Sequence, residues 1–392
     1  MNILIINDFL FSSKSNKYFP FLEIFDYIRI RDNKIKLIPL ILFKENIEDI
    51  NSLDIQSFIQ KDIDSSTRKI QNKWKNFLLS LLKGYPFFLF KKLIENKRKN
   101  MIVHLVSGFL PIFCGSIICK ILNLPCIVGP NAIPSKNLIF KPIFKLNNFN
   151  FFIRDLIISS LPYNKMICFS KYQQKILRRK FKIRHEKINL VGIGINRHFF
   201  YNLHEVNLKI SLFNNELKTI LYVGADKEEK GFNQFIRICK SLLENNIKIN
   251  ILIIGIKNDK SINKLKREFE NWKGNIKIMK WISRLKLINY YNLADLYINP
   301  SIDETWSMTT IEALSCGTPC ICSKIPIFKK HIIENYNGLL FNINDDQDLV
   351  SKIKKGLKIN WDRKNISINT LKKYDWNIQA EKMIKIYNNY IQ

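Results

Sequence analysis

The sequence predicts an α/β protein built from two doubly wound parallel-sheet domains. Short apolar runs alternate with segments of about 10 to 15 residues in which apolar side chains recur at helical spacing. Several of these runs end abruptly, as at Gly224 and Pro300-Ser301, which is typical of strands that lead into a loop. Such alternation favours parallel sheets with right-handed crossovers, and 392 residues suffice for two of them.

The first half of the chain is expected to contain six strands. Their approximate positions are residues 3–6, 36–42, 102–106, 125–128, 166–169 and 188–191. The first run is broken at once by Asn7-Asp8, so we interpret it as a strand and not as a signal peptide. Residues 101–119 are interrupted by two glycines and a proline, which argues against a transmembrane helix. They predict a βαβ unit whose helix covers residues 112–122.

The second half is expected to contain six more strands. These lie near residues 219–223, 249–254, 276–279, 295–299, 319–322 and 338–341. In parallel sheets, ligands bind beyond the carboxyl ends of the strands. Gly224 and Pro300 each end one of these strands, so they mark the expected ligand site. A ligand bound there would face the first domain across a cleft.

One segment of the second half points to chemistry. Glu304 follows an apolar strand, and Glu312 lies eight positions later in a predicted helix, about two turns deeper. The helix start, with Ser307, Met308 and Thr309, presents unpaired N–H groups that suit a phosphate. Glu312 is suited to the paired hydroxyls of a ribose, and Glu304 to the group beyond the phosphate. The geometry indicates a nucleotide-sugar, although chance spacing and a solvated helix face remain alternatives for the two glutamates.

This stretch resembles the signature of the retaining glycosyltransferases of family 4, whose fold of two facing Rossmann-like domains is called GT-B. The family pattern is Pro-Ser, a few residues, then Glu-x7-Glu-Ala-x-Ala/Ser-x-Gly-x-Pro. The chain reads Pro300-Ser301, Glu304, and then Glu312-Ala313 through Gly317 and Pro319. Weaker likenesses to the family occur at residues 190–196, 220–224, 230–232, 337–341 and 374–376.

The resemblance implies three parts of the chain and a reaction. Residues 1–200 would form an acceptor- and membrane-facing domain, residues 201–375 a nucleotide-sugar-binding domain, and residues 376–392 a helix that returns to the first domain. The implied reaction retains the anomeric configuration and uses no metal or cofactor, with the nucleotide-sugar as co-substrate. Glu304 is the expected catalytic residue. The expected donor-binding residues are Gly224, Lys230, Ser307, Met308, Thr309 and Glu312.

Several positions of the second half depart from the family. Ala225 stands where an arginine usually completes the diphosphate clamp, and Lys227 is a partial substitute because an ammonium lacks the guanidinium fork. Pro326-Ile327 replace an expected glycine pair, and Lys330 stands where glutamate is frequent. These replacements concern the contacts to the donor sugar. For Lys230, a solvated loop lysine is the alternative interpretation.

The first domain gives weaker signals. The loop from Asn7 to Ser15 has no glycine, although the family usually has a glycine-rich loop there. Asn131 follows the strand near 125–128 and is a candidate cleft residue. His104 is either near the cleft or a satisfied core histidine. In the second domain, Trp281 lies where the family contacts the base, and a packed surface tryptophan is the alternative.

The formal net charge of +30 is concentrated in one part of the chain. Residues 51–200 hold 26 basic and 6 acidic residues. No nucleic acid is expected, because the chain shows no zinc-finger spacing, aromatic RNA-binding signature or recognisable DNA-reading helix. Residues 72–101 and 138–156 mix basic with aromatic side chains, as helices in a lipid headgroup layer do. Unless these are amphipathic helices packed on their own domain, they predict a cytoplasmic protein on the anionic inner face of the cell membrane.

The eight cysteines invite a comparison with metal sites. Cys316, Cys320 and Cys322 lie close together, but no Cys-x2-Cys pair accompanies them and the five histidines are scattered. Cys320 and Cys322 alternate with Ile321 in a strand pattern. We therefore expect buried thiols and no zinc.

Three hypotheses for the function follow. The leading one is a nucleotide-sugar-dependent glycosyltransferase that acts on a lipid-linked or membrane-proximal glycan acceptor during assembly of bacterial surface polysaccharides. The second, motivated by Ala225 and the missing glycines, is a catalytically weak member of the family that serves as a membrane-associated scaffold. The third is a basic nucleic-acid binder, which would bind in a strongly salt-dependent way.

Overall fold

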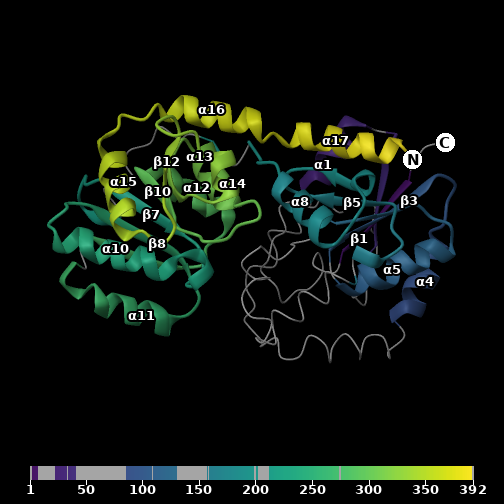
Figure 1. Ribbon diagram of the computed structural model, residues 1–392, viewed down its shortest axis with the longest axis horizontal. Helices are drawn as coiled ribbons and strands as arrows, with labels where there is room; N and C mark the ends of the chain where they lie inside the picture. Colours follow the sequence, from purple (N-terminus) through teal and green to yellow (C-terminus); the bar gives the residue numbers. More distant parts are fainter. Residues whose placement is uncertain are drawn as a thin grey trace. The chain divides into compact units, whose positions relative to one another are not determined.

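The computed structural model shows two compact α/β units, each with a six-stranded parallel sheet (Figure 1). The described residues are 2–7, 23–32, 34–40, 85–107, 109–129, 157, 159–197, 200–201, 212–272 and 275–390. One unit comprises Met1–Gly192 with Trp376–Gln392, and the other comprises Ile193–Asp375. The predicted class of two parallel-sheet α/β domains is confirmed.

The sheet of the first unit has the order β2-β1-β3-β4-β5-β6. Its strands are β1 (Asn2–Asn7), β2 (Lys36–Leu40), β3 (Met101–Ser107), β4 (Cys126–Val128), β5 (Lys165–Cys168) and β6 (Ile188–Leu190). Its helices are α1 (Glu23–Arg31), α4 (Tyr85–Glu95), α5 (Phe109–Ile121), α8 (Lys171–Lys180) and α17 (Trp376–Asn388), with a 3₁₀ turn at His185–Lys187.

Helices pack on both faces of this sheet. Because successive side chains in a strand point to opposite faces, alternate residues of β1 and β3 belong to different layers. Leu4 and Val103 share one core with apolar residues of α4, α5 and α8. On the other face, His104 contacts Phe25 of α1 and Tyr387 of α17, and these two helices pack against each other (Figure 1).

The sheet of the second unit has the order β12-β11-β10-β7-β8-β9. Its strands are β7 (Thr219–Val223), β8 (Asn250–Ile256), β9 (Ile276–Lys280), β10 (Leu296–Asn299), β11 (Cys320–Ser323) and β12 (Gly338–Phe341). Its helices are α10 (Phe232–Glu244), α11 (Asp259–Glu268), α12 (Arg284–Leu293), α13 (Met308–Ser315), α14 (Pro326–His331), α15 (Asp346–Lys358) and α16 (Arg363–Lys373). Short 3₁₀ turns lie at Glu228–Lys230 and Glu270–Trp272.

The strand order of the second sheet reverses between β7 and β10. The chain builds outward from β7 through β8 to β9, and then returns to β10 on the other side of β7. At such a switch point the loops after the two central strands diverge and leave room for a ligand. The loops that follow Val223 and Asn299 are therefore the natural place to search for a site.

All twelve predicted strands are present, with ends that differ by at most two residues within the described ranges. One helix differs more. The helix predicted over 112–122 begins at Phe109, because Pro111 lies in the first helical turn, where a missing N–H breaks no intrahelical bond.

Two sequence predictions concern membranes and thiols. None of the helices in the described part of the chain is long and apolar enough to span a bilayer. Residues 138–156 and the first part of the segment 72–101 lie outside the described residues; the rest of that segment contains α4 and the start of β3. All eight cysteines are buried, as predicted for Cys320 and Cys322.

Candidate active site

The loops after β7 and β10 pack backbone against backbone at the switch point. Gly231 has φ +65°, and a Cβ atom on it would lie 2.1 Å from the Pro300 carbonyl oxygen. The Ile302 N–H donates to the Glu229 carbonyl oxygen at 3.1 Å. Only glycine fits the Gly231 position, because it tolerates both the left-handed conformation and the contact. The close approach brings side chains of the two loops into one site.

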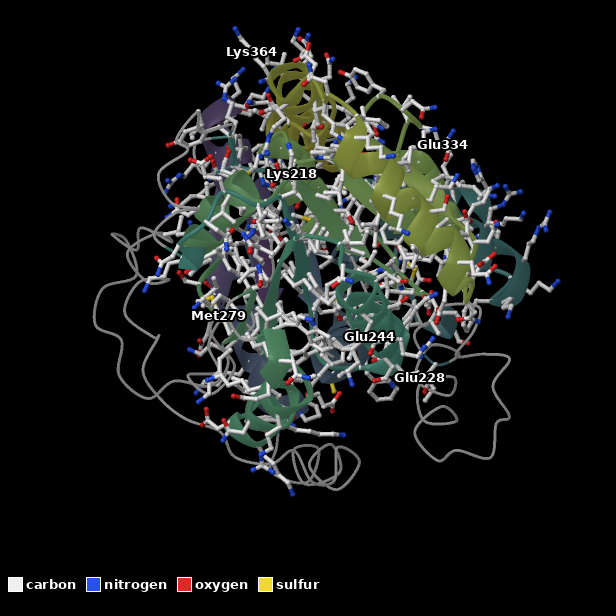
Figure 2. The ribbon with its side chains drawn as sticks, turned by 90° about the vertical axis from the view of Figure 1, so that its left-hand side faces the viewer. Lys218, Glu228, Glu244, Met279, Glu334 and Lys364 are labelled. Carbon is white, nitrogen blue, oxygen red and sulfur yellow. The ribbon has the colours of Figure 1, made fainter. Side chains whose placement is uncertain are left out.

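Lys230 and Glu304, which are 74 positions apart in the sequence, form an ion pair in this site. The Lys230 Nζ donates to the Glu304 Oε1 at 2.6 Å, and the side chains are 34% and 14% exposed. The structure thus brings together two residues that the sequence assigned to one ligand, Lys230 to its diphosphate and Glu304 to its sugar. Lys227 lies 3.5 Å from Glu229 in an exposed pair, and Figure 2 shows neighbouring Glu228 at the surface of the unit.

Helix α13 begins within the residues that the sequence predicted for its start. Its first residue is Met308, and the preceding Ser307 is in the left-handed region with φ 59° and ψ 70°. Glu304 therefore lies in a non-helical turn, and the prediction that Glu312 is two helical turns deeper is wrong. Glu312 is four residues into the helix, which is about one turn or 6 Å along its axis.

The hydroxyl groups at this helix start are engaged inside the protein. The Ser307 Oγ lies 3.0 Å from the Thr310 Oγ1 and accepts a hydrogen bond from the Asn299 side-chain amide at 3.1 Å. The Thr309 Oγ1 accepts from the Tyr297 hydroxyl at 2.8 Å. The groups that suit an anion are therefore the backbone N–H groups of the first turn, which have no acceptor within the helix.

Glu312 has two partners that the sequence did not reveal. The Arg284 Nε donates to its Oε1 at 2.5 Å, and the Tyr291 hydroxyl donates to its Oε2 at 3.1 Å. The Arg284 guanidinium also lies 4.9 Å from the centre of the Phe200 ring. Glu312 is almost fully buried, and burial beside its charge raises the pKa of Tyr291 well above the ordinary value. The carboxylate is thus fixed from both sides.

A further carboxylate lies next to Glu304. Burial raises the pKa of Asp303 to about 6, and the negative charge of Glu304 adds to the shift while Lys230 opposes it. Near neutral pH, the turn therefore holds one carboxylate paired with lysine and one that is costly to ionise.

Four sequence candidates remain, and one of them lies outside the described residues. Trp281 follows β9 and is 62% exposed. Asn131 lies outside the described residues. His104 is fully buried, and both of its ring nitrogens are hydrogen-bonded, so the alternative of a core histidine is correct. Gly224 contributes backbone: its N–H donates to the Ile254 carbonyl at 2.9 Å.

The site lies within the part of the chain that matches a known family. Residues 204–373 match the family model described as Glycosyl transferases group 1. That part of the chain resembles the glycosyltransferases of this group. The match includes Lys230, Glu304, α13 and Glu312, so the cluster described above lies within the matched residues.

Two curated relatives are glycosyltransferases by name. The chain is 26% identical over 57% of its length to an uncharacterized glycosyltransferase of Methanocaldococcus jannaschii, and the alignment covers 59% of that protein. It is 22% identical over 70% of its length to the UDP-Gal:alpha-D-GlcNAc-diphosphoundecaprenol alpha-1,3-galactosyltransferase of Escherichia coli, covering 71% of that protein. The family match and the named relatives support a transferase enzyme.

The solved structures support the fold. Sucrose-phosphate synthase from Thermosynechococcus elongatus matches with a TM-score of 0.72 at 15% identity, covering 99% of this chain and 98% of that one. At this identity the likeness concerns the fold alone. Together with the two parallel sheets, it shows the GT-B fold.

The second unit offers complementary groups for an anionic ligand with two ends. A cationic side chain, Lys230, and the amides of the first turn of α13 flank the same turn, with carboxylates on either side. Within the described ranges, no cluster of three or more His, Cys, Asp or Glu side chains is arranged to hold a metal ion.

Proposed function

We propose that the protein is a retaining glycosyltransferase that transfers a sugar from a nucleotide-sugar donor to a lipid-linked glycan acceptor in bacterial surface polysaccharide biosynthesis. The observation that carries the proposal is the convergence of Lys230, Glu304 and the start of α13 at the switch point of the second sheet. The name of the Escherichia coli relative, which gives an activated sugar and a diphosphoundecaprenol acceptor, supports the substrate classes.

The diphosphate leaving group is the part of the donor that needs stabilisation as its bond to the sugar breaks. In the proposed arrangement, the N–H groups of Met308 and Thr309 donate to phosphate oxygens, and the Lys230 ammonium neutralises developing charge. The backbone contact at Gly231 holds the loop that carries Lys230 before the ligand arrives, and preorganised donors stabilise a transition state without reorganisation.

The two glutamates bind the two ends of the donor. Glu312, held by Arg284 and Tyr291, accepts hydrogen bonds from the ribose hydroxyls through its remaining lone pairs. Glu304 holds sugar hydroxyls and stabilises positive charge at the reacting carbon. Retention is inferred from the resemblance to family 4, and no residue is assigned as a covalent nucleophile.

The acceptor proposal is supported by the surface of the first unit. Helices α4, α5 and α8 share one core on one face of its sheet. These helices also carry exposed apolar and basic side chains. The exposed apolar residues are Phe87, Ile94, Ile117 and Ile121. The exposed basic residues of the same three helices are Lys91, Lys120, Lys171, Lys175, Arg178, Arg179 and Lys180.

A surface of this composition fits an anionic bilayer. Apolar side chains enter the headgroup boundary, and each basic residue near an anionic membrane contributes about 1 kcal/mol. The protein is therefore proposed to act peripherally on the inner face of the cell membrane, where a lipid-linked acceptor is found. Reversing the charge of Lys171, Lys175 and Arg178 would then weaken vesicle binding roughly a hundredfold.

Flotation with vesicles of phosphatidylglycerol and phosphatidylcholine measures that effect. The matched control reverses Lys260, Lys266 and Arg267, three exposed basic residues around α11 of the second unit. Equal loss of binding in both triple variants would mean that total charge, and not this face, directs the protein to the vesicles.

The transfer reaction is tested with a panel of UDP-, GDP- and ADP-sugars, first by thermal shift and then by donor hydrolysis and transfer. Glu304→Gln keeps the shape of the side chain but removes its charge, and it should reduce turnover at least about a hundredfold. Glu244→Gln, at the exposed end of α10 (Figure 2), is the control and should retain wild-type turnover. Full activity of the Glu304 variant would refute the catalytic assignment.

A membrane-associated scaffold is the second candidate, and Ala225 is the observation that favours it. The Ala225 carbonyl accepts a hydrogen bond from the Tyr222 hydroxyl at 2.9 Å, and no guanidinium can be supplied from this position. A scaffold would bind the nucleotide and vesicles, yet show no turnover with any donor. It would also retain its cellular role when Glu304 is replaced.

A further inference from the structure

A buried histidine forms a hydrogen bond to the turn between Glu304 and α13. His331, the last residue of α14, is 1% exposed. Its Nε2 lies 2.7 Å from the carbonyl oxygen of Trp306, the residue immediately before the strained Ser307. A carbonyl oxygen can only accept, so the Nε2 carries the proton and donates it to Trp306.

The other ring nitrogen of His331 is fixed by a tyrosine. The Tyr374 hydroxyl lies within hydrogen-bond distance of the Nδ1 and must donate to it, because the proton of the neutral ring is on the Nε2. Burial, opposed by the hydrogen bond to Trp306 and aided by the positive charges of Lys330 and Lys373, lowers the pKa of His331 to about 3. The ring is therefore neutral at physiological pH, in one tautomer.

The Trp306 side chain is held by the same group. The rings of Trp306, His331 and Tyr374 meet edge to face in all three pairs, with centroids 5.6, 6.1 and 5.4 Å apart. The Lys330 ammonium lies 4.3 Å from the centre of the Trp306 ring. Both the carbonyl and the ring of Trp306 are thus fixed before the chain enters α13.

This anchoring explains how a strained backbone persists next to the site. Ser307 has φ 59°, which costs free energy for a residue with a Cβ and is retained only when the surroundings enforce it. From the sheet side, the Asn299 amide donates to the Ser307 Oγ. From the α14 side, His331 holds the preceding carbonyl.

We propose that His331 is a positioning residue for the transfer reaction: by holding the Trp306 carbonyl, it fixes the direction of the first amides of α13 and of Glu304 toward the donor. The inference rests on the proposed function, because it assigns the turn to donor binding. It predicts that removing the two hydrogen bonds of His331 weakens nucleotide binding in molecules that remain folded.

The first unit contains a matched control. His104 is fully buried, its Nδ1 lies 2.7 Å from the Tyr387 hydroxyl, and its Nε2 lies 2.7 Å from the Gly129 carbonyl oxygen. It thus has the same kinds of partner and the same burial as His331, but it belongs to the other unit. Replacement by phenylalanine leaves one carbonyl and one hydroxyl buried without a ring partner in either case.

The experiment compares His331→Phe with His104→Phe in the full-length protein. Titration calorimetry with UDP, GDP and ADP first identifies the nucleotide that the wild type binds most tightly. We expect both variants to lose thermal stability to a similar extent. Only His331→Phe should weaken binding of that nucleotide, by tenfold or more. His331→Gln, whose amide both donates and accepts, should restore a large part of the affinity.

Each outcome decides one point. Equal nucleotide affinity of the wild type and folded His331→Phe would overturn the inference and leave the proposed function standing. Absence of nucleotide binding by the wild type would overturn both. If His331→Phe does not fold, Tyr374→Phe, which removes the single hydroxyl that contacts the His331 ring, is compared with the wild type. Unchanged nucleotide affinity of folded Tyr374→Phe would overturn the inference.

Discussion

Arg284 and Glu312 form a buried ion pair, with the Arg284 Nε donating to the Glu312 Oε1 at 2.5 Å and side chains only 19% and 4% exposed. The pair joins the first residue of α12 to the middle of α13. Because Tyr291 holds the second oxygen, the carboxylate has one orientation. The stability that this ion pair contributes can therefore be measured separately from the proposed binding of ribose by Glu312.

Arg284→Met should destabilise the protein by about 3 kcal/mol, because it leaves a buried carboxylate without its cation. Urea unfolding measures the loss. Arg237→Met is the control: its pair with Asp346 is 59% and 39% exposed, and it should cost at most about 1 kcal/mol. Adding Glu312→Gln to Arg284→Met should restore part of the stability, and similar costs for the two arginine variants would contradict the prediction.

Gly231→Ala should destabilise the second unit by more than about 2 kcal/mol, since the new Cβ meets a backbone oxygen and the φ is positive. The clash should also separate the loops that carry Lys230 and Glu304 and so weaken nucleotide binding. Gly356→Ala in α15 is the comparison, because its Cβ would meet only side chains at 3.1 Å or more. Unfolding curves that order the two variants the other way would refute this account.

Ser307→Gly and Ser307→Ala should differ in stability, although both remove the hydroxyl that contacts Asn299 and Thr310. Glycine also removes the left-handed strain, so it should be about 1 kcal/mol more stable than alanine. Denaturant titration tests the order. Asn246, exposed with φ 55°, offers the same glycine-to-alanine comparison without a buried hydroxyl, and the difference there should be similar.

Asp303→Asn should stabilise the protein in a pH-dependent way. The pKa of Asp303 is raised from 3.8 to about 6, so the folded state keeps this proton while the unfolded chain releases it. Wild-type stability associated with this group is present below about pH 4 and is lost as the pH rises through 6. The melting-temperature advantage of the asparagine variant should grow over that window and then level off.

The pKa of Asp362 is shifted in the opposite direction to that of Asp303. Hydrogen bonds from the Asn365 backbone and side chain lower the pKa of Asp362, so its contribution is present at neutral pH and is lost in acid. Asp362→Asn should therefore show no growing advantage as the pH rises. Parallel pH profiles for the two variants would mean that the raised pKa of Asp303 does not govern its stability.

The fold was accessible from sequence because each strand is a short apolar run with a clear end. The run Ile220–Val223 before Gly224, for example, needs no knowledge of its neighbours to be recognised. The conformation of the turn before α13 was less accessible. Residues 304–307 contain no proline or glycine to mark a turn, and the left-handed conformation of Ser307 is set by tertiary bonds.

The candidate site was partly predictable for a similar reason. Lys230, Glu304 and Glu312 lie next to recognisable strand ends or in a patterned helix, so their positions follow from local signals. Arg284 and His331 carry no such signal. Their partners are fixed only when α12 and α14 pack around α13 and its preceding turn.

The burial of all eight thiols gives the protein a practical property. Maleimide reagents need an accessible thiolate, so the native cysteines should react slowly while the protein is folded. A cysteine introduced at exposed Lys364 (Figure 2) would then be labelled selectively with a fluorophore, without first removing the natural ones. The second unit can thus be watched by single-molecule fluorescence in the otherwise unaltered chain.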